Sequence, residues 1–213
     1  MPSDSDSLPP EFVERVRELE RAYLSTDDPI RQSGFLAGPE RWRNERELIL
    51  DPMDEDGDIL DVGCANGYLL ECLVGWAAER GIRLVPYGVD IGARLIELAK
   101  RRLPQYADHF WVANSWEWHP PRRFRYVYAL YDCVPDEFLR EYVGRLLSHY
   151  VEENGTLIVG AYGSYSRNEP ARDLARDLAG WGFRVAGSSV RGKFPVARVV
   201  WMTAHCARAT DCG

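Results

Sequence analysis

The stretch 58–71, Asp-Ile-Leu-Asp-Val-Gly-Cys-Ala-Asn-Gly-Tyr-Leu-Leu-Glu, constrains the fold more than any other part of the chain. An apolar run that begins at Ile59 is typical of a short strand buried on both faces. Gly63 and Gly67 then bracket a turn into a helix, and glycine permits both unusual backbone angles and close approach of a ligand. We therefore expect this turn to hold a nucleoside-bearing ligand.

Strands and helices are predicted to alternate along the chain. The pattern predicts further strands over residues 83–89, 110–113, 124–130, 156–160, 183–187 and 197–205. Helices are expected over residues 11–24, 40–50 and 170–179, after the turn as far as Gly81, before Pro104, and from Asp136. Such alternation implies an α/β fold with a mostly parallel sheet and helices on both faces, because parallel strands need crossover connections. The last two strands have no helix between them, so they should form a hairpin at one edge.

The predicted elements divide the chain into three parts. Residues 1–10 are mainly Ser, Asp and Pro, a composition that favours a disordered tail. Residues 11–50 are expected to form an N-terminal helical cap, and residues 51–213 the ligand-binding core. Aromatic side chains in the cap, such as Phe35 and Trp42, suit a lid over a cleft, but a helix packed on the sheet edge needs them equally.

Composition argues against several classes of function and location. The net charge of -7 gives no global positive field for phosphate backbones, so nucleic acid is a disfavoured partner. The five cysteines show neither zinc-ligand spacing nor a disulfide framework, which favours reduced thiols. The N-terminus lacks the basic and apolar regions of a signal peptide, and no apolar run reaches membrane-spanning length. We therefore expect a cytoplasmic protein without a membrane partner.

The residues of the turn discriminate between nucleotide ligands. A dinucleotide-binding Gly-x-Gly-x-x-Gly motif counted from Gly63 needs glycine at the positions that Ala65 and Tyr68 occupy. An NAD-dependent oxidoreductase is therefore a weaker alternative. A phosphate-binding loop is excluded more firmly, because no Gly-Lys-Ser or Gly-Lys-Thr follows the turn. The Gly-x-Ala-x-Gly turn, preceded by Asp61, suits a ligand without a pyrophosphate.

The segment Asp-Val-Gly-Cys-Ala-Asn-Gly at 61–67, followed by Tyr-Gly-Val-Asp at 87–90, resembles the class I S-adenosylmethionine-dependent methyltransferases. The resemblance covers roughly residues 57–205 and implies a Rossmann-like sheet of seven strands with the last strand antiparallel. It also implies S-adenosylmethionine as the cofactor. The residues expected to bind this cofactor are Asp61, Gly63, Cys64, Ala65, Gly67, Asp90, Ile91, Asn114, Ser115, Trp116 and Tyr131.

The resemblance implies a separate role for each part of this set. The turn at 63–67 would let the methionyl portion lie against the backbone, and Asp61 would help to hold its ammonium group. Asp90 would accept hydrogen bonds from both ribose hydroxyls, as an acid does at the end of the second strand in dinucleotide folds. Ile91 would cover one face of the adenine.

The adenine side departs from the common pattern of the family. An acid often follows the third strand there, whereas this chain has Asn114 and Ser115. An amide oxygen can still accept the hydrogen bond from the adenine amino group, although Ser115 or a main-chain group would also serve. Trp116 is a candidate adenine cover or a packing residue. Tyr131 follows the fourth strand and should reach the methionyl end of the cofactor.

Methyl transfer from a sulfonium is an in-line displacement, so the protein contributes mainly alignment, on the order of 7 to 11 kcal/mol. Where the acceptor must lose a proton, Asp132 is the candidate base at the end of the fourth strand, and a capping or ion-pairing role is its alternative. Tyr131 is a second catalytic candidate. With Tyr162 and Tyr165 it is expected to line the acceptor pocket. No metal is expected, because Asp132 has no obvious carboxylate partner after the fifth strand.

The predicted function is transfer of a methyl group from S-adenosylmethionine to an oxygen or nitrogen of a small molecule. The alternatives are methylation of RNA or protein, and a module that binds the cofactor without transferring its methyl group. Members of the superfamily that methylate nucleic-acid amino groups resemble one another in an Asp/Asn-Pro-Pro-Tyr/Phe motif after the fourth strand. The Tyr-Asp-Cys-Val sequence at 131–134 differs from that motif.

Overall fold

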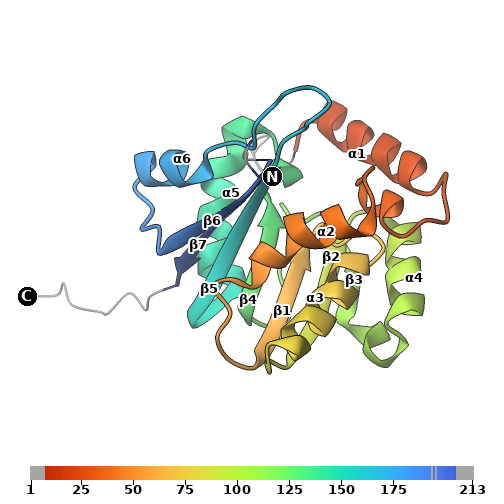
Figure 1. Cartoon of the computed structure of the whole chain (residues 1–213), viewed down its shortest axis with the longest axis horizontal. Helices are drawn as coiled ribbons and strands as arrows, with labels where there is room; N and C mark the ends of the chain where they lie inside the picture. Colours follow the sequence, from red (N-terminus) through yellow and green to blue (C-terminus); the bar gives the residue numbers. More distant parts are fainter. Residues whose placement is uncertain (1–7, 193, 195, 205–213) are drawn as a thin grey trace, which may run out of the picture.

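The structure, a computed structural model, describes residues 8–192, 194 and 196–204, within which seven strands form one sheet (Figure 1). The strand order is β3-β2-β1-β4-β5-β7-β6. β7 is antiparallel to both neighbours, and every other adjacent pair is parallel. The predicted Rossmann-like fold with an antiparallel last strand and an edge hairpin is confirmed. The strands are β1 (Gly57–Val62), β2 (Leu84–Asp90), β3 (Phe110–Val112), β4 (Phe124–Leu130), β5 (Val151–Tyr162), β6 (Gly187–Arg191) and β7 (Ala197–Thr203).

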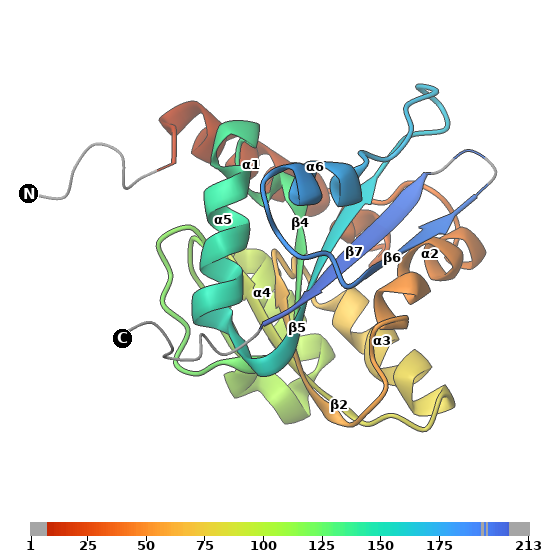
Figure 2. The same ribbon diagram turned by 90° about the vertical axis from the view of Figure 1, so that its left-hand side faces the viewer.

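Helices cover both faces of the sheet (Figure 2). On β4, Tyr126 and Tyr128 join the core shared with α3 and α4, and the alternating Val127 and Ala129 join the core beneath α5 and α6. Burial on both faces explains why the central strands are almost continuously apolar. None of the described helices is long and apolar enough to span a membrane. The α-helices are α1 (Pro10–Tyr23), α2 (Pro39–Arg46), α3 (Tyr68–Glu79), α4 (Ala93–Arg102), α5 (Leu139–Arg145) and α6 (Leu174–Gly180).

Short helical turns complete several predicted helices. The segment predicted as one helix over 40–50 is α2 followed by a tight turn, and the helix predicted from Asp136 begins as a tight turn, continues as α5 and ends in a wider π-type turn. These short elements are η1 (Arg31–Ser33), η2 (Glu47–Leu50), η3 (Pro104–His109), η4 (Tyr131–Cys133), η5 (Asp136–Phe138) and η6 (Leu146–Tyr150).

The N-terminal segment is ordered earlier than its composition suggests. α1 begins at Pro10, and Leu8 is only 6% exposed because it packs in the core cluster with Phe12. The predicted tail over 1–10 is thus corrected for residues 8–10, and its residues 1–7 lie outside the described part of the chain. α1 lies beyond the carboxyl ends of the central strands, at the upper edge of Figure 1.

The predicted cap over 11–50 contains two differently packed parts. α1 lies over the ends of the strands, whereas Leu48, Ile49 and Leu50 are fully buried in the core with Ile59. This apolar run packs against α3 and β6. The end of the predicted cap therefore packs as part of the core.

Two strand predictions are corrected in the second half of the chain. β5 extends over Val151–Tyr162 rather than 156–160, because Asn154 adopts a φ of 61° and forms an irregularity within the strand instead of a separate turn. β6 occupies Gly187–Arg191 rather than 183–187. Phe183 and Val185 are the apolar residues behind that prediction, and they pack against the core before the chain reaches the sheet edge.

The bounds of two other elements also shift. α6 begins at Leu174 rather than near 170, and Asp173 caps it by accepting a hydrogen bond from a first-turn N–H group. β7 ends at Thr203, and residue 205, the predicted end of this strand, lies outside the described residues.

Candidate functional site

The glycine turn joins β1 to α3 in a backbone conformation that few residues adopt. Gly63 has a φ of 86° and Gly67 a φ of 73°, and Ala65 between them has a φ of 45°. A Cβ atom on Gly67 would lie 2.9 Å from the Cβ of Ala99 in α4, so this glycine permits close packing of the turn on α4. Gly67 does not line the cavities described below. Its position in the structure is that of a packing residue.

Asp90, at the end of β2, is bound to the turn by its carboxylate. Its Oδ2 accepts a hydrogen bond from the N–H of Ala65 (2.9 Å), and its Oδ1 accepts one from the N–H of Gly92 (2.7 Å). Burial raises the pKa of Asp90, and these two hydrogen bonds oppose the rise. A carboxylate has about four acceptor sites, so both oxygens keep capacity for ligand hydroxyls.

A cavity of about 100 Å³, here called the inner cavity, lies between these strand ends and α1. Gly63 and four other predicted binding residues line this cavity, and apolar side chains on the inner face of α1 close it. Its walls suit a flat apolar ring with a polar sugar. The lining residues are Leu8, Phe12, Val13, Val16, Gly63, Val89, Asp90, Ile91, Ala113, Asn114, Ser115 and Cys133.

The adenine-side residues are partly engaged within the protein. The Oδ1 of Asn114 accepts a hydrogen bond from the N–H of Trp116 (3.1 Å), and the hydroxyl of Tyr142 donates to Ser115 Oγ (3.0 Å). Trp116 is 3% exposed and packs edge-on against Phe138, so it does not line the inner cavity. The structure thus places Trp116 in the core rather than at the expected adenine cover.

A second cavity, of about 50 Å³ and here called the turn cavity, lies on the other side of Gly63. Asp61 lines it and is 2% exposed. Burial, with a smaller contribution from the charge of Asp90, raises the pKa of Asp61 to about 8. The lining residues are Ser33, Trp42, Arg46, Asp61, Gly63, Cys64, Ala65, Leu69, Tyr128, Leu130 and Tyr162.

Arg46, the last residue of α2, was not predicted from the sequence. Its guanidinium lies 3.4 Å from the ring centroid of Tyr162, and its Nη1 is 3.8 Å from Oε2 of Glu45. This Nη1 is buried and has no hydrogen-bond partner among the described residues. Arg46 and Asp61 therefore place a cation and an acid on the same small cavity, which complements the carboxylate and ammonium of an α-amino acid.

Asn66 was also missed, although it lies inside the recognised turn. It is fully buried, and its Nδ2 donates to the carbonyl of Pro29 (3.0 Å) and to Oε1 of Gln32 (3.1 Å). Its Oδ1 accepts a hydrogen bond from the N–H of Tyr68 at the start of α3 (3.1 Å). Asn66 thus fixes the segment before α2 against the turn, and only its place in the motif could have indicated this.

Tyr131 and Asp132 lie on η4 and line an open cavity of about 490 Å³, here called the acidic cavity. The Asp132 side chain is exposed on one side, but desolvation by the surrounding protein raises its pKa, and a backbone hydrogen bond and Arg15 of α1 oppose this rise. The cavity adjoins the inner cavity, because Phe12 lines both. Its lining residues are Pro9, Glu11, Phe12, Arg15, Tyr131, Asp132, Val134, Pro135, Asp136 and Glu137.

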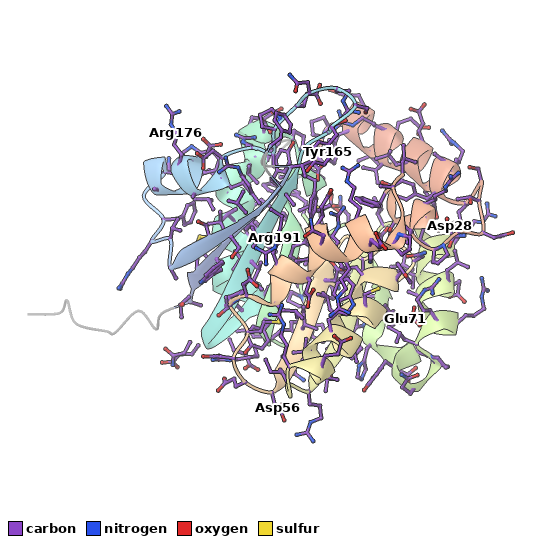
Figure 3. All side chains as sticks on the ribbon, in the orientation of Figure 1. Asp28, Asp56, Glu71, Tyr165, Arg176 and Arg191 are labelled. Carbon is purple, nitrogen blue, oxygen red and sulfur yellow. The ribbon has the colours of Figure 1, made fainter. Side chains whose placement is uncertain are left out.

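Tyr162 and Tyr165 line a different open cavity, of about 480 Å³ and here called the arginine cavity. Figure 3 shows Tyr165 at the upper end of the sheet, beyond β5. The cavity adjoins the turn cavity, because Arg46 and Tyr162 line both. Its lining residues are Gly34, Phe35, Leu36, Ala37, Arg41, Glu45, Arg46, Tyr162, Gly163, Ser164, Tyr165, Ser166 and Arg167. Within the described chain, no group of three or more His, Cys, Asp or Glu side chains is arranged to hold a metal ion.

Curated relatives of the chain are trans-aconitate 2-methyltransferases of Rhodopseudomonas palustris. Over 143 residues the chain is 32% identical to the protein of strain HaA2 and 33% identical to that of strain BisB5. Each match covers 66% of this chain and 52% of the relative, so the chain spans about half the length of the curated relatives it matches. No family model matches the chain.

Solved structures share the fold at low sequence identity. A SAM-dependent methyltransferase from Aquifex aeolicus superposes with a TM-score of 0.54 at 18% identity, over 90% of this chain and 97% of that one. The DhpI–SAM–HEP complex gives a TM-score of 0.55 at 19% identity, over 89% and 94% of the two chains. The chain thus shares its fold with S-adenosylmethionine-dependent methyltransferases, and over 66% of its length its sequence is similar to that of curated methyltransferases.

Proposed function

We propose that this chain transfers a methyl group from S-adenosylmethionine to an oxygen or nitrogen of a small molecule. The observation that carries the proposal is the pair of cavities that meet at Gly63. One offers Asp90 and an apolar slot to an adenosine, and the other offers Asp61 and Arg46 to an amino acid. S-adenosylmethionine consists of these two parts joined by a sulfonium.

The residues present fit this cofactor on both sides of the turn. Asp90 would accept hydrogen bonds from the ribose hydroxyls, and Ile91 would pack against the adenine. Asn114 and Ser115 would face the adenine edge. Asp61 would hold the ammonium. Nη1 of Arg46 has no hydrogen-bond partner among the described residues, which supports Arg46 as the donor to the carboxylate of the cofactor.

When bound, the cofactor supplies a methyl group on a positively charged sulfur. The acceptor's lone pair forms the new bond to the methyl carbon while the carbon–sulfur bond breaks and leaves its electrons on sulfur. The chain's main contribution is to hold the reacting atoms in line and exclude water. Asp132 lines the acidic cavity, so it would take a proton only from an acceptor that enters through that cavity, a role that its raised pKa favours.

We infer that residues 11–50 act as a cap and that α1 is its mobile part. Leu8, Phe12, Val13 and Val16 form one wall of the inner cavity. Only one hydrogen bond between α1 and α4 is present among the described contacts, from the N–H of Arg94 to Oε1 of Glu20 (3.2 Å). Outward movement of α1 would open the adenosine site, and it would expose Leu8 and Phe12, which are buried in the closed form.

The proposed acceptor is a small molecule, and the location is proposed to be cytoplasmic. The curated relatives are named for trans-aconitate, a small molecule. The acidic net charge argues against an RNA substrate. Cys64, Cys72 and Cys133 are free thiols, which suits a reducing compartment.

Isothermal titration with S-adenosylhomocysteine, the product of the cofactor, tests the assignment. Wild-type protein should bind it, and Asp90→Ala should weaken binding at least tenfold. The matched control is Asp56→Ala, at the opposite end of the sheet, where Asp56 pairs with the exposed Arg83 (Figure 3). Absence of binding, or equal binding by a folded Asp90→Ala variant, would refute the proposal.

Turnover separates an enzyme from a binding module. Incubation with S-adenosylmethionine and a panel of small organic acids, alcohols and amines should release S-adenosylhomocysteine in the presence of one class. Tight binding without release for any acceptor would instead support the module.

A further inference from the structure

We infer that the arginine cavity is the acceptor site and that it takes a carboxylate-bearing small molecule with an apolar body. This inference rests on the proposed function and names the substrate class of the same site. An acceptor must reach the sulfonium from an open cavity that adjoins the cofactor space. Two cavities of about 480 to 490 Å³ qualify: the arginine cavity, which adjoins the turn cavity, and the acidic cavity, which adjoins the inner cavity. A smaller cavity of about 280 Å³ borders the inner cavity at Asp90, on the side expected for the ribose.

The two cavities differ in the sign of their charge. Three arginines and one glutamate line the arginine cavity, namely Arg41, Arg46, Arg167 and Glu45. Four acids and one arginine line the acidic cavity, namely Glu11, Asp132, Asp136, Glu137 and Arg15. In a chain with a net charge of -7, a cationic cavity is a local departure from the general surface. The first cavity therefore suits an anion, and the second a cation.

Buried charges in the arginine cavity are not balanced within the protein. The Glu45 side chain is 2% exposed and contacts two guanidinium groups, those of Arg41 and Arg46. One carboxylate thus serves two cations, and Nη1 of Arg46 has no hydrogen-bond partner among the described residues. A buried guanidinium that shares its acid with a second arginine and keeps one nitrogen without a hydrogen bond is costly, so an anion is favoured here. The methionyl carboxylate can satisfy Arg46, which leaves the acceptor to Arg41.

Arg41 is oriented to receive that acceptor. Its Nε donates to Glu45, which fixes the guanidinium plane, and its Cζ lies 4.3 Å from the ring centroid of Tyr165. Its side chain remains 39% exposed, so its terminal nitrogens are accessible from the cavity. A planar guanidinium held in this way matches a carboxylate in two-point contact.

Arg167 offers a second donor on the outer rim. It is paired with Glu169 at 2.7 Å, but both side chains are more than half exposed. Such surface pairs contribute little free energy, so Arg167 can exchange its partner for a ligand carboxylate.

The rim of the cavity accounts for the apolar part of the acceptor. Leu36 is 84% exposed and Tyr165 is 45% exposed, and both line this cavity together with Phe35. These two side chains border the same opening, so together they form an exposed apolar patch that suits contact with the apolar part of a ligand. A volume of about 480 Å³ accommodates a small aryl or alkyl acid.

The test uses protein saturated with S-adenosylhomocysteine and titrated with phenylacetate, 3-phenylpropionate, hexanoate and propane-1,2,3-tricarboxylate. Each acid is compared with its neutral amide, and 3-phenylpropylamine represents the cationic class. We expect phenylacetate, 3-phenylpropionate or hexanoate to bind at least tenfold more tightly than its amide. Arg41→Gln should remove that difference while leaving affinity for S-adenosylhomocysteine unchanged, which also shows that the variant is folded.

Arg43→Gln is the matched control on the same helix. Arg43 pairs with Glu47 and Glu79 and does not line the arginine cavity, so this variant should keep the preference for the acid. Saturation by S-adenosylhomocysteine with no acid bound more tightly than its amide overturns the inference but not the proposed function. Tighter binding of the amine also overturns it and assigns the acceptor to the acidic cavity. Tighter binding of the tricarboxylate alone overturns the inference that the acceptor has an apolar body. Failure to bind S-adenosylhomocysteine refutes the proposed function itself.

Discussion

The protonation state of Asp61 should control binding of the amino-acid end of the cofactor. The rise of its pKa from 3.8 to about 8 corresponds to a cost of ionisation on the order of 6 kcal/mol, at 1.36 kcal/mol per pKa unit. The carboxyl is buried, so solvent screening does not reduce this cost appreciably. In the ligand-free protein at pH 7, Asp61 is therefore mainly protonated, and an ammonium group has to displace that proton to form an ion pair.

The sign of the pH dependence follows from the displaced proton. Below about pH 8, binding through ionised Asp61 releases one proton, so the affinity for S-adenosylhomocysteine should rise by up to about tenfold per pH unit from pH 6. The ligand's amino group belongs to a free amino acid, so it loses its charge at a higher pH than a peptide N-terminus does, and affinity should fall there. Titration calorimetry from pH 6 upward should give a maximum above about pH 8.

Two comparisons assign this profile to Asp61. Asp61→Asn should lose the acidic limb, because the amide does not ionise. 5′-Methylthioadenosine lacks the amino-acid end but keeps the ribose, so its affinity should not rise with pH in this way. Any remaining change of its affinity with pH would report the ionisation of Asp90. An acidic limb of equal steepness in Asp61→Asn, or with 5′-methylthioadenosine, would refute the assignment.

Three further predictions concern the cap, the turn and the reaction. Phe12→Ala should raise the dissociation rate of S-adenosylhomocysteine about tenfold, because it removes part of the inner-cavity wall. Leu19→Ala, at an exposed position on the same helix, should leave that rate unchanged. Equal dissociation rates of the two variants in stopped flow would contradict the role of α1 as a lid. Gly67→Ala should lower the free energy of unfolding by roughly 2 kcal/mol, because the added Cβ clashes with α4 and the φ at this position is positive. Gly75→Ala, where the added Cβ meets open space, should raise the free energy of unfolding by roughly 0.5 to 1 kcal/mol. Urea denaturation that shows no difference between the two variants would disprove the close packing at Gly67. Asp132→Asn should leave kcat and cofactor affinity unchanged for a carboxylate acceptor bound in the arginine cavity, because Asp132 lines the acidic cavity instead. A fall in kcat by about a hundredfold to ten-thousandfold would place the acceptor beside Asp132.

Local patterns were sufficient for most of the fold. The central strands are buried on both faces, so each appears in the sequence as an apolar run between polar or glycine-containing turns. β6 was misplaced because an edge strand has only one paired neighbour, and the apolar residues near it, Phe183 and Val185, serve the core instead. The pattern identified where apolar residues gather but not which of them pair in the sheet.

Residues far apart in the sequence explain what was missed at the site. Asp61, Gly63 and Asp90 were recognised because their spacing is fixed by one strand, one helix and the next strand. Arg46 resembles the other arginines of its helix, and only the folded chain shows that its guanidinium reaches Tyr162. Trp116 was expected near the adenine because it follows β3, yet the backbone turn held by Asn114 directs it into the core.

The buried acids that make the site specific should also destabilise the protein when no ligand is bound. The charge of Asp90 disfavours ionisation of Asp61, and burial raises both pKa values. Asp90 is bound by the hydrogen bond from Ala65 to the turn that follows Asp61, so it cannot move away without breaking this bond. A ligand that brings an ammonium to one and hydroxyl donors to the other removes both penalties at once. The amino-acid and ribose ends should therefore bind with positive coupling, so that 5′-methylthioadenosine and free methionine each bind far more weakly than their separate contacts within S-adenosylhomocysteine would suggest.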